Sequence, residues 1–341
     1  MHIAPPLPVE VLDQIVDLSS RADQACFLRI NPTFNAIARR LLYRSISIEL
    51  SHKCITLLRT LSGSRSKLYS HLVHTLDIIL KNSRSHPIGN FARLLNRALQ
   101  SLANLTTLSA PGHPLQICKG CTFSLKNLSA ECRVDPELGA FLALHPSIDE
   151  LCIRGGPGMQ DGYMCLPSSI LPNLSAVRLL IPDPALLRSL VHGRPVRHTS
   201  VIILQSFLPY VEALALSAVP VERVSMMFFE CPNPSELLIA AAKLLPEIEA
   251  LHVVILTGSC PLEPLKLAAP LLSSFLKLRF ITFMAGDDKT TLAVEREVAE
   301  LWQKACPSLK TIILPNGVVW FCKPGGDIFP VMSEGKVPDL E

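Results

Sequence analysis

The sequence predicts an α/β protein in which a small three-helix module, residues 1–48, precedes an irregular array of repeats with a parallel sheet. Three observations favour this class. Residues 7–43 carry apolar positions at helical spacing between helix-start signals, and a Pro-x-Φ-x-x-Φ-x-Φ pattern, in which Φ is apolar, recurs in the second half. Of the 341 residues, 49% are apolar and only 18% are charged, which is enough to bury a substantial core.

The first predicted helix begins at Pro8, which suits a first helical turn because its missing N–H would have no partner inside the helix. The apolar residues of this helix form two adjacent faces. One face holds Val9, Leu12 and Val16, and the other holds Val11, Ile15 and Leu18. A surface helix needs only one apolar stripe to pack inward. We therefore expect the helix to pack inward with one of these faces and to offer the other to a partner.

Two further helices are predicted in the same module. Ser20, with Asp23 three residues later, resembles a capping box and predicts a helix that runs toward Ile30. Asn31 and Pro32 give the N-cap and first-turn signals of a third helix. The three helices carry more apolar surface than roughly forty residues can bury alone, so the module needs a neighbour.

Residues 7–43 resemble the F-box in the form found in large fungal families. The resemblance runs through the motifs Leu7-Pro8-x-Glu10-Val11-Leu12-x-x-Ile15, Phe27-Leu28-x-Ile30-Asn31-x-x-Phe34 and Ala38-x-x-Leu41-Leu42-Tyr43. Two features depart from the family pattern: Phe34 stands where many members have Trp, and the spacer at residues 19–22 is polar.

In that family the module docks on a Skp-type adaptor, and through it on the cullin of a cullin–RING ubiquitin ligase. The resemblance implies that seven apolar residues make this contact: Leu7, Pro8, Val11, Leu12, Ile15, Leu28 and Ile30. The alternative is an N-terminal helical cap on a larger domain, with no adaptor contact.

The Pro-x-Φ-x-x-Φ-x-Φ pattern predicts a series of short strands. It begins at Pro146, Pro172, Pro209, Pro246 and Pro307, and weaker copies without Pro begin at Leu105 and Leu278. The last two Φ positions alternate as in a strand with one buried face. Helix starts fall between the strands, at Asp135-Pro136, Asp183-Pro184 and Asn233-Pro234.

Such a repeated strand and helix resembles an irregular leucine-rich-repeat solenoid with a parallel sheet. Successive first Φ positions lie 26 to 43 residues apart, and the regular Asn ladder of the leucine-rich repeat is missing. The alternative is an ordinary α/β domain.

If the strands stack in register, one x position of each strand points outward on a common face, because side chains alternate across a strand. The predicted positions are Cys152, Arg178, Ala215, His252, Thr282 and Ile313. Only Arg178 among them is charged, so we expect a largely neutral face that a partner or the chain's own loops cover.

The predicted organisation has four parts. The module at residues 1–48 is followed by a connecting region of helices and loops at residues 49–98, and the leucine-rich-repeat-like array covers residues 99–322. Residues 323–341 are polar and rich in Pro, Gly and acid, so we expect a flexible tail.

The motifs of several enzyme classes are missing from the sequence. It contains no G-x-S-x-G elbow, phosphate loop or H-E-x-x-H motif. Cys118 and Cys121 form the only CxxC pair, whereas a structural zinc site needs four ligands. The net charge of +3 is small for a nucleic-acid-binding chain, and no run of about 20 apolar residues or signal-peptide pattern occurs. We expect no catalysis, cofactor, metal, nucleic acid or membrane, and a cytoplasmic or nuclear location.

The F-box resemblance gives these expectations a function. It implies a substrate-recruiting subunit of a Skp/cullin/RING ubiquitin ligase, whose module binds the adaptor while the repeats bind an unknown protein substrate. The alternative is a leucine-rich-repeat-like interaction scaffold unconnected to ubiquitination.

Overall fold

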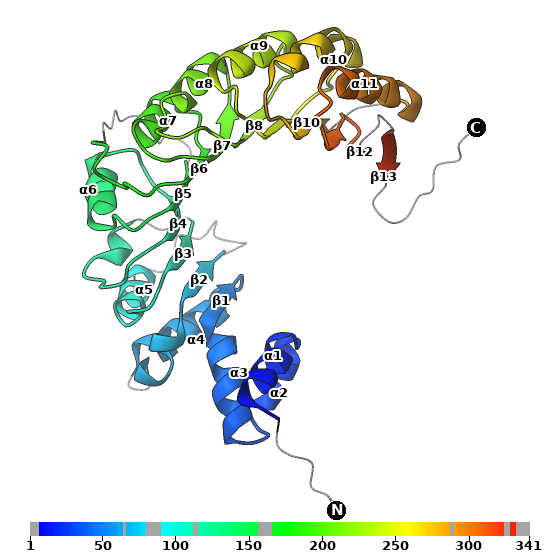
Figure 1. Cartoon of the computed structure of the whole chain (residues 1–341). Helices are drawn as coiled ribbons and strands as arrows, with labels where there is room; N and C mark the ends of the chain where they lie inside the picture. Colours follow the sequence, from blue (N-terminus) through cyan, green and yellow to red (C-terminus); the bar gives the residue numbers. More distant parts are fainter. Residues whose placement is uncertain are drawn as a thin grey trace, which may run out of the picture. The chain divides into compact units, whose positions relative to one another are not determined.

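The computed structural model describes residues 7–63, 66–79, 90–111, 115–155, 166–286, 290–323 and 328–331. These residues form a mixed α/β structure in which most strands pair in parallel (Figure 1). The chain divides into two compact units, Met1–Cys132 and Arg133–Glu341, which we call unit 1 and unit 2. The unit boundary thus falls beyond the predicted boundaries at residues 48 and 98.

Unit 1 begins with three helices and continues into four parallel strands. Its helices are α1 (Val9–Asp17), α2 (Arg21–Phe27), α3 (Pro32–Arg44), α4 (Ser51–Ser62) and α5 (Phe91–Gln100), with 3₁₀ turns η1 (Ser66–Leu68), η2 (Ser70–Leu72) and η3 (Leu115–Cys118). Its strands are β1 (Ser45–Ile48), β2 (Thr75–Ile78), β3 (Thr107–Ala110) and β4 (Asn127–Glu131), and each pairs in parallel with the next.

The helix starts predicted in the N-terminal module are confirmed. The Ser20 side chain caps α2 by accepting a hydrogen bond from the Asp23 N–H, and the Asn31 side chain accepts from Phe34 N–H at the start of α3. These polar side chains satisfy N–H groups that have no partner within the helix. The three helices therefore begin where local sequence dictates.

Unit 2 alternates strands and helices and ends in an antiparallel hairpin. Its helices are α6 (Pro136–Leu144), α7 (Pro184–Val191), α8 (Leu208–Leu214), α9 (Pro234–Leu244), α10 (Leu262–Ala268) and α11 (Leu292–Ala305), with the 3₁₀ turn η4 (Ala269–Ser274). Its strands are β5 (Glu150–Arg154), β6 (Ala176–Leu180), β7 (His198–Ile203), β8 (Arg223–Phe228), β9 (Ala250–Ile255), β10 (Phe280–Ala285), β11 (Thr311–Ile313), β12 (Val319–Cys322) and β13 (Ile328–Val331).

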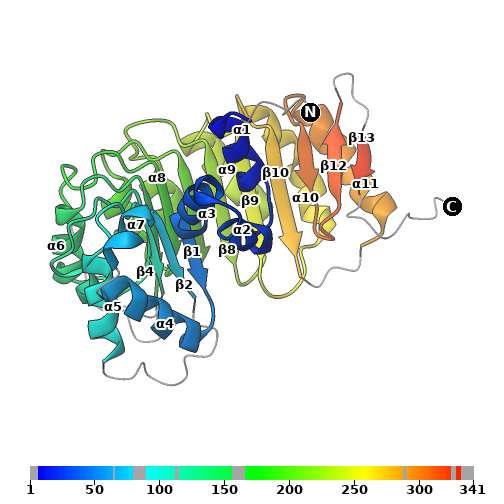
Figure 2. The ribbon, with the colours of Figure 1, turned by 90° about the horizontal axis from the view of Figure 1, so that it is seen from below.

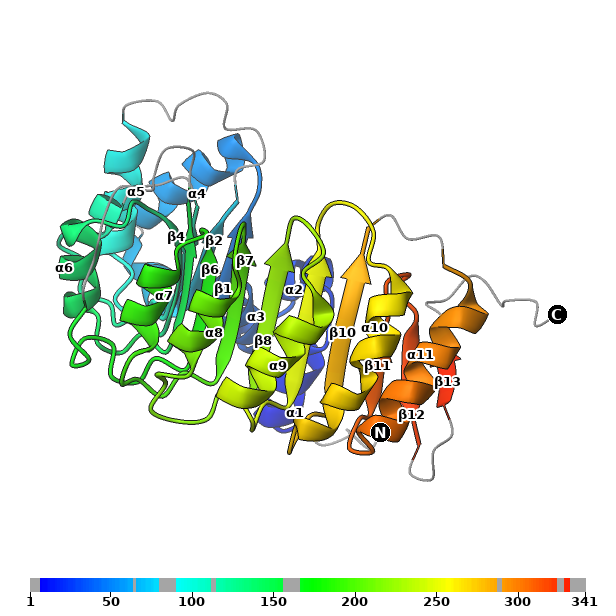
Figure 3. The ribbon, with the colours of Figure 1, turned by 90° about the horizontal axis from the view of Figure 1, so that it is seen from above.

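The two faces of the unit 2 sheet differ. Helices α7 to α11 lie side by side over one face (Figure 3), and Phe283 of β10 packs edge-on against Trp302 of α11 there. Figure 2 views the strands from the opposite side, where none of the described helices of unit 2 covers them. The core of the unit thus lies between the strands and their own helices.

One burial pattern recurs from β2 to β11. Two residues before each strand lies a buried residue, and the residues three and five positions after it are buried as well. The first members of these sets, 20 to 32 residues apart, are Val73, Leu105, Leu125, Ile148, Leu174, Val196, Val221, Ile248, Leu278 and Leu309. The Φ-x-x-Φ-x-Φ part of the predicted pattern therefore describes the strands better than the Pro that precedes it.

The sequence pattern missed several strands and misplaced one. At Pro209 the structure has helix α8 instead of a strand, and its buried residues Val211 and Leu214 follow helical spacing. Strands β7 and β8 lie on either side of this helix, outside the predicted positions. The predicted connecting region at residues 49–98 already contains β2, so the sheet begins well before residue 99.

The expected flexible tail is wrong for residues 328–331, which form strand β13. Gly317, with φ at +77°, turns the chain between β11 and β12. Strand β12 therefore pairs antiparallel with β11, and β13 pairs antiparallel with β12. Trp320 of β12 is fully buried, and Pro330 of β13 lies opposite it. Burial of the Trp320 side chain stabilises the hairpin, whose two strands are themselves largely apolar. Residues 332–341 lie outside the described part.

The three predicted helix caps that precede a proline are all present in unit 2. At α7 the Asp183 carboxylate accepts a hydrogen bond from Leu186 N–H at 2.9 Å, and the helix is followed by Gly193 with φ at +69°, a conformation that glycine adopts readily after a helix. Asp135 and Asn233 cap α6 and α9 in the same way.

The cap of α7 allows a direct test. We expect Asp183→Ala to lower the free energy of unfolding of unit 2 by about 1 kcal/mol, because the N–H loses its acceptor, whereas Asp183→Asn should cost only a few tenths. Urea unfolding followed by fluorescence measures the loss, since both tryptophans lie in unit 2. Equal losses in the two variants would contradict a capping role.

Candidate partner-binding surface

One side of helix α1 belongs to the core of the N-terminal module. Val16 is fully buried in a cluster with Ile37 and Ala38 of α3. Partly buried side chains surround this cluster: Leu12, Phe27, Leu28, Phe34 and Leu41. The rings of Phe27 and Phe34 stack with centroids 5.2 Å apart. The inner side of α1 is thereby fixed by α2 and α3.

The other apolar side of α1 is exposed. Leu7, Val11, Ile15 and Leu18 are exposed by 56%, 38%, 43% and 88%, respectively. At 100° per residue, Val11, Ile15 and Leu18 fall within an arc of about 60° beside the buried stripe. Leu7 lies just before the helix, because Pro8 at its N-cap has extended backbone. We call these three residues together with Leu7 the α1 stripe. Single exposed apolar residues are common, but three on one side of one helix, with a fourth just before it, mark an interaction surface.

Polar contacts hold the α1 stripe in a fixed setting. The buried Gln24 side chain donates to the carbonyls of Val16 at 2.9 Å and Ser19 at 3.2 Å, which joins the end of α1 to α2. Asp13 on α1 forms an ion pair with Arg40 on α3. A partner therefore meets a helix that needs little reorganisation on binding.

The structure separates the seven residues implied by the F-box resemblance into two groups. Five are exposed: Leu7, Pro8, Val11, Ile15 and Ile30. The other two, Leu12 and Leu28, are partly buried against the module's own core. These two side chains contribute to the fold of the module at least as much as to any contact.

Two apolar residues of α1 differ from their sequence assignment. Val9 was predicted on the same face as Leu12 and Val16 but is 56% exposed, because it lies in the first turn, ahead of the part of α1 that packs on the core cluster. Leu18 was absent from the contact set, yet it is the most exposed member of the α1 stripe. Helical spacing from Val11 and Ile15 was the signal that could have included it.

A second candidate surface is the helix-free face of the unit 2 sheet. Strand register places one residue from each of seven strands in a single row: Cys152, Arg178, Ser200, Ser225, His252, Thr282 and Ile313. Five of the six predicted outward positions are thus confirmed as one row. Ala215 is wrong, because it follows helix α8, and Ser200 and Ser225 occupy the places of the two missed strands.

This row is close to neutral, as expected from the sequence. Arg178 is exposed, Thr282 is buried and the others are partly buried. The imidazole Nδ1 of His252 lies 2.9 Å from the hydroxyl of Thr282. Burial, and secondarily the charge of Arg223, lowers the pKa of His252, so its side chain is neutral at pH 7.

The described part of the chain contains no group of three His, Cys, Asp or Glu side chains placed to hold a metal ion. Burial raises the pKa of the Cys118 thiol to about 12 and that of the Cys121 thiol to about 11, so this CxxC pair stays protonated at neutral pH.

None of the described helices is both long and apolar enough to cross a membrane. No protein-family model matches the sequence, and no curated protein is significantly similar to it. The α1 stripe and the helix-free sheet face are therefore the features from which a function must be argued.

Proposed function

We propose that this protein is a substrate-recruiting subunit of a Skp/cullin/RING ubiquitin ligase. Helices α1 to α3 act as an F-box-like module that binds a Skp-type adaptor, and the strand–helix repeats bind a protein substrate. The protein performs no chemistry itself but raises the local concentration of substrate near the ligase. The observation that carries the proposal is the exposed α1 stripe beside a buried stripe on the same helix.

The position of the α1 stripe supports docking of an adaptor. Val11, Ile15 and Leu18 lie on one side of a helix whose other side is anchored in the core, and Leu7 is exposed just before its first turn. Burying an exposed Leu, Ile or Val side chain yields on the order of 1.5–3 kcal/mol, so several such residues provide a useful binding energy. The F-box resemblance implies a contact through Leu7, Val11 and Ile15, and these three residues belong to the exposed α1 stripe.

The repeats support the substrate-binding half of the proposal. Their buried positions recur every 20 to 32 residues in the Φ-x-x-Φ-x-Φ pattern, a spacing typical of leucine-rich-repeat-like solenoids. Repeat arrays bind partners through the side chains along one face. In unit 2 the face without helices offers such a surface.

Three single substitutions on α1 test adaptor binding. We expect Val11→Asp and Ile15→Asp each to reduce capture of a purified Skp-type adaptor at least tenfold, because a carboxylate would be buried in an apolar contact. Val9→Asp is the matched control, since Val9 is also exposed in the first turn but lies about 160° around the helix from Val11. It should leave binding within about twofold. Pull-down and titration with the full chain measure these effects.

Thermal melting separates loss of contact from loss of fold. Because Val11 and Ile15 are exposed, their Asp variants should melt close to the unaltered protein, whereas Val16→Asp should unfold the module. Adaptor binding that survives deletion of residues 1–45 would contradict the proposal. A scaffold unconnected to ubiquitination would instead show no adaptor binding by the unaltered chain.

A further inference from the structure

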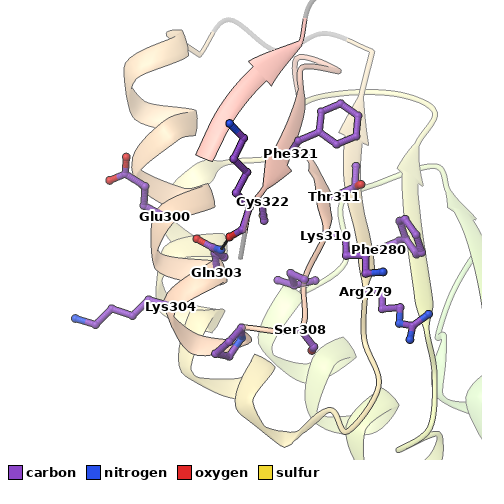
Figure 4. Close-up of a pocket in the computed structure, with 13 residues that line it drawn as sticks. Arg279, Phe280, Glu300, Gln303, Lys304, Ser308, Lys310, Thr311, Phe321 and Cys322 are labelled. Atoms are coloured by element: carbon purple, nitrogen blue, oxygen red, sulfur yellow. Dashed lines mark hydrogen bonds between the residues drawn. The ribbon is translucent and has the colours of Figure 1, made fainter. Parts of the chain in front are cut away.

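A patch at the amino ends of strands β10 and β11 in unit 2 combines aromatic and basic side chains. Arg279, Phe280, Lys310, Phe321 and Lys323 line an open hollow of about 1240 Å³ (Figure 4). We call these five residues the basic aromatic patch. In Figure 4, Phe280 and Phe321 lie on the side of the strands away from α11, with Arg279 beside them.

The aromatic part of the patch follows from strand register. Phe280 is paired with Thr311, Thr311 with Phe321, and Phe321 with Phe329, so their side chains share one face. Phe321 and Phe329 remain 38% and 37% exposed, and their rings stack with centroids 6.1 Å apart. These rings present rigid apolar area of the kind that anchors a partner's side chain.

The basic part of the patch forms no ion pair within the described residues. Arg279, Lys310 and Lys323 are exposed, and none of them forms an ion pair there; the Lys323 ammonium lies 4.8 Å from the centre of the Phe329 ring. The one carboxylate that lines the hollow, Glu300, pairs with Arg296 on its own helix at 2.9 Å.

Glu249 occupies the neighbouring register position before β9. The main-chain N–H of Arg279 donates to the Glu249 carbonyl at 2.8 Å. The side chains of Arg279 and Glu249 nevertheless form no ion pair in the described part of the structure. Glu222, just before β8, already forms an ion pair with Arg197. The three cations outnumber the single nearby carboxylate of Glu249, which also interacts with Lys277, so the patch carries an excess positive charge.

We infer that the basic aromatic patch binds an acidic segment of a partner protein that also carries an aromatic or large aliphatic side chain. Carboxylates of the segment pair with Arg279, Lys310 and Lys323, and its apolar side chain packs on Phe280 and Phe321. Charge complementarity identifies the class of partner, and the rings supply area that charge alone does not. This inference deepens the proposed function, since the segment would belong to the recruited substrate.

Selection from a random peptide library tests the inference on the full chain. Displayed twelve-residue peptides selected by the unaltered protein should be enriched in Asp and Glu around a Phe, Trp or Leu. The charge-reversed variant Arg279→Glu/Lys310→Glu should instead select Lys and Arg. Synthetic copies of the most enriched acidic peptide should bind this variant at least tenfold more weakly, and the neutral variant Arg279→Gln/Lys310→Gln should weaken binding by about three- to tenfold.

Lys243→Glu is the matched control, because Lys243 is an exposed cation of α9 that does not line the hollow. It should leave the peptide affinity within about twofold, and binding to the unaltered chain should weaken as salt is raised. Phe321→Ser should also weaken binding without changing the charge. Melting curves check that every variant folds.

Several outcomes would overturn the inference. They are selection of neutral peptides, the same peptides selected by the charge-reversed variant, an equal effect of Lys243→Glu, or preferred binding of a single-stranded oligonucleotide over the acidic peptide. The Skp-type adaptor takes no part in this experiment. Failure here therefore leaves the adaptor-binding proposal intact, and failure of adaptor binding leaves peptide recognition by the patch intact.

Discussion

Replacing Arg194 by Met should lower the free energy of unfolding of unit 2 by about 3–5 kcal/mol, because three buried main-chain carbonyls would lose their hydrogen-bond donor. Arg194 is fully buried at the turn between α7 and β7, and its guanidinium donates to the main-chain carbonyls of Ile170, Ser189 and Pro167 at 2.6–2.7 Å. Met fills a similar volume but leaves these carbonyls without a donor, at about 1–3 kcal/mol for each one that water cannot reach.

Arg194→Lys tests whether charge alone suffices. Lysine keeps the positive charge but cannot direct donors at three separated carbonyls as a planar guanidinium does, so we expect most of the loss to remain. Arg197→Met is the matched control, because Arg197 is exposed and its ion pair with Glu222 contributes at most about 1 kcal/mol. Urea unfolding followed by tryptophan fluorescence compares the three. A loss in Arg194→Met no larger than in Arg197→Met would refute this account.

A loss of similar size, about 3–5 kcal/mol, is expected for Trp302→Ala. Trp302 on α11 is fully buried. Its indole N–H donates to the Leu265 carbonyl of α10 at 2.9 Å, and its ring meets Phe283 of β10 with centroids 5.6 Å apart. One side chain thus joins two helices and the sheet, and its removal leaves a cavity that three elements must close.

Two further variants divide this effect. Trp302→Phe keeps much of the packing but leaves the Leu265 carbonyl without its donor, so we expect a loss of about 1–3 kcal/mol. Leu301→Ala, at the neighbouring position and 40% exposed, should change stability by about 0.5 kcal/mol or less. Unfolding of the Trp302 variants can be followed by Trp320, the other tryptophan of unit 2. Equal stability of the Trp302→Ala and Leu301→Ala variants would contradict the packing described here.

The prediction of the strands depended on where proline stands relative to the first apolar residue of the pattern. Requiring Pro two residues before the first Φ excluded β7 and β8, where Pro195 and Pro220 stand immediately before the buried Val196 and Val221. In β7 the next buried position is Thr199, a polar residue that an apolar pattern does not count. Relaxing the Pro position would have found β8, while β7 also needs the sheet around it to bury a threonine.

The false strand at Pro209 has a different cause. Val211 and Leu214 are three residues apart, a spacing shared by the predicted turn-and-strand pattern and by one face of a helix. The neighbouring buried residues Tyr210 and Ala213 complete a helical face, which settles the ambiguity in favour of α8. A short apolar segment could not decide this alone, because the tertiary contacts select between the two periods.

The candidate surface on α1 was predictable in outline. Periodicity gave two apolar stripes on one helix, but the sequence of α1 alone does not say which stripe is buried. The packing of α3 decides it, since Ile37 and Ala38 meet Val16 and leave Ile15 outside. The basic aromatic patch could not be foreseen, because it depends on the register of β10, β11 and β12 and on an antiparallel hairpin that lacked a sequence signal.

The hairpin of β12 and β13 has a consequence for self-association. A parallel array that ended at β11 would present a row of free N–H and C=O groups, onto which the first strand of another copy could add without limit. Instead, β12 covers that edge in the reverse direction, and the outermost described strand is four residues long with a proline at position 330. Proline offers no N–H to an incoming strand. The described array thus ends in a strand that is a poor template for another copy, which disfavours end-to-end polymerisation of the protein.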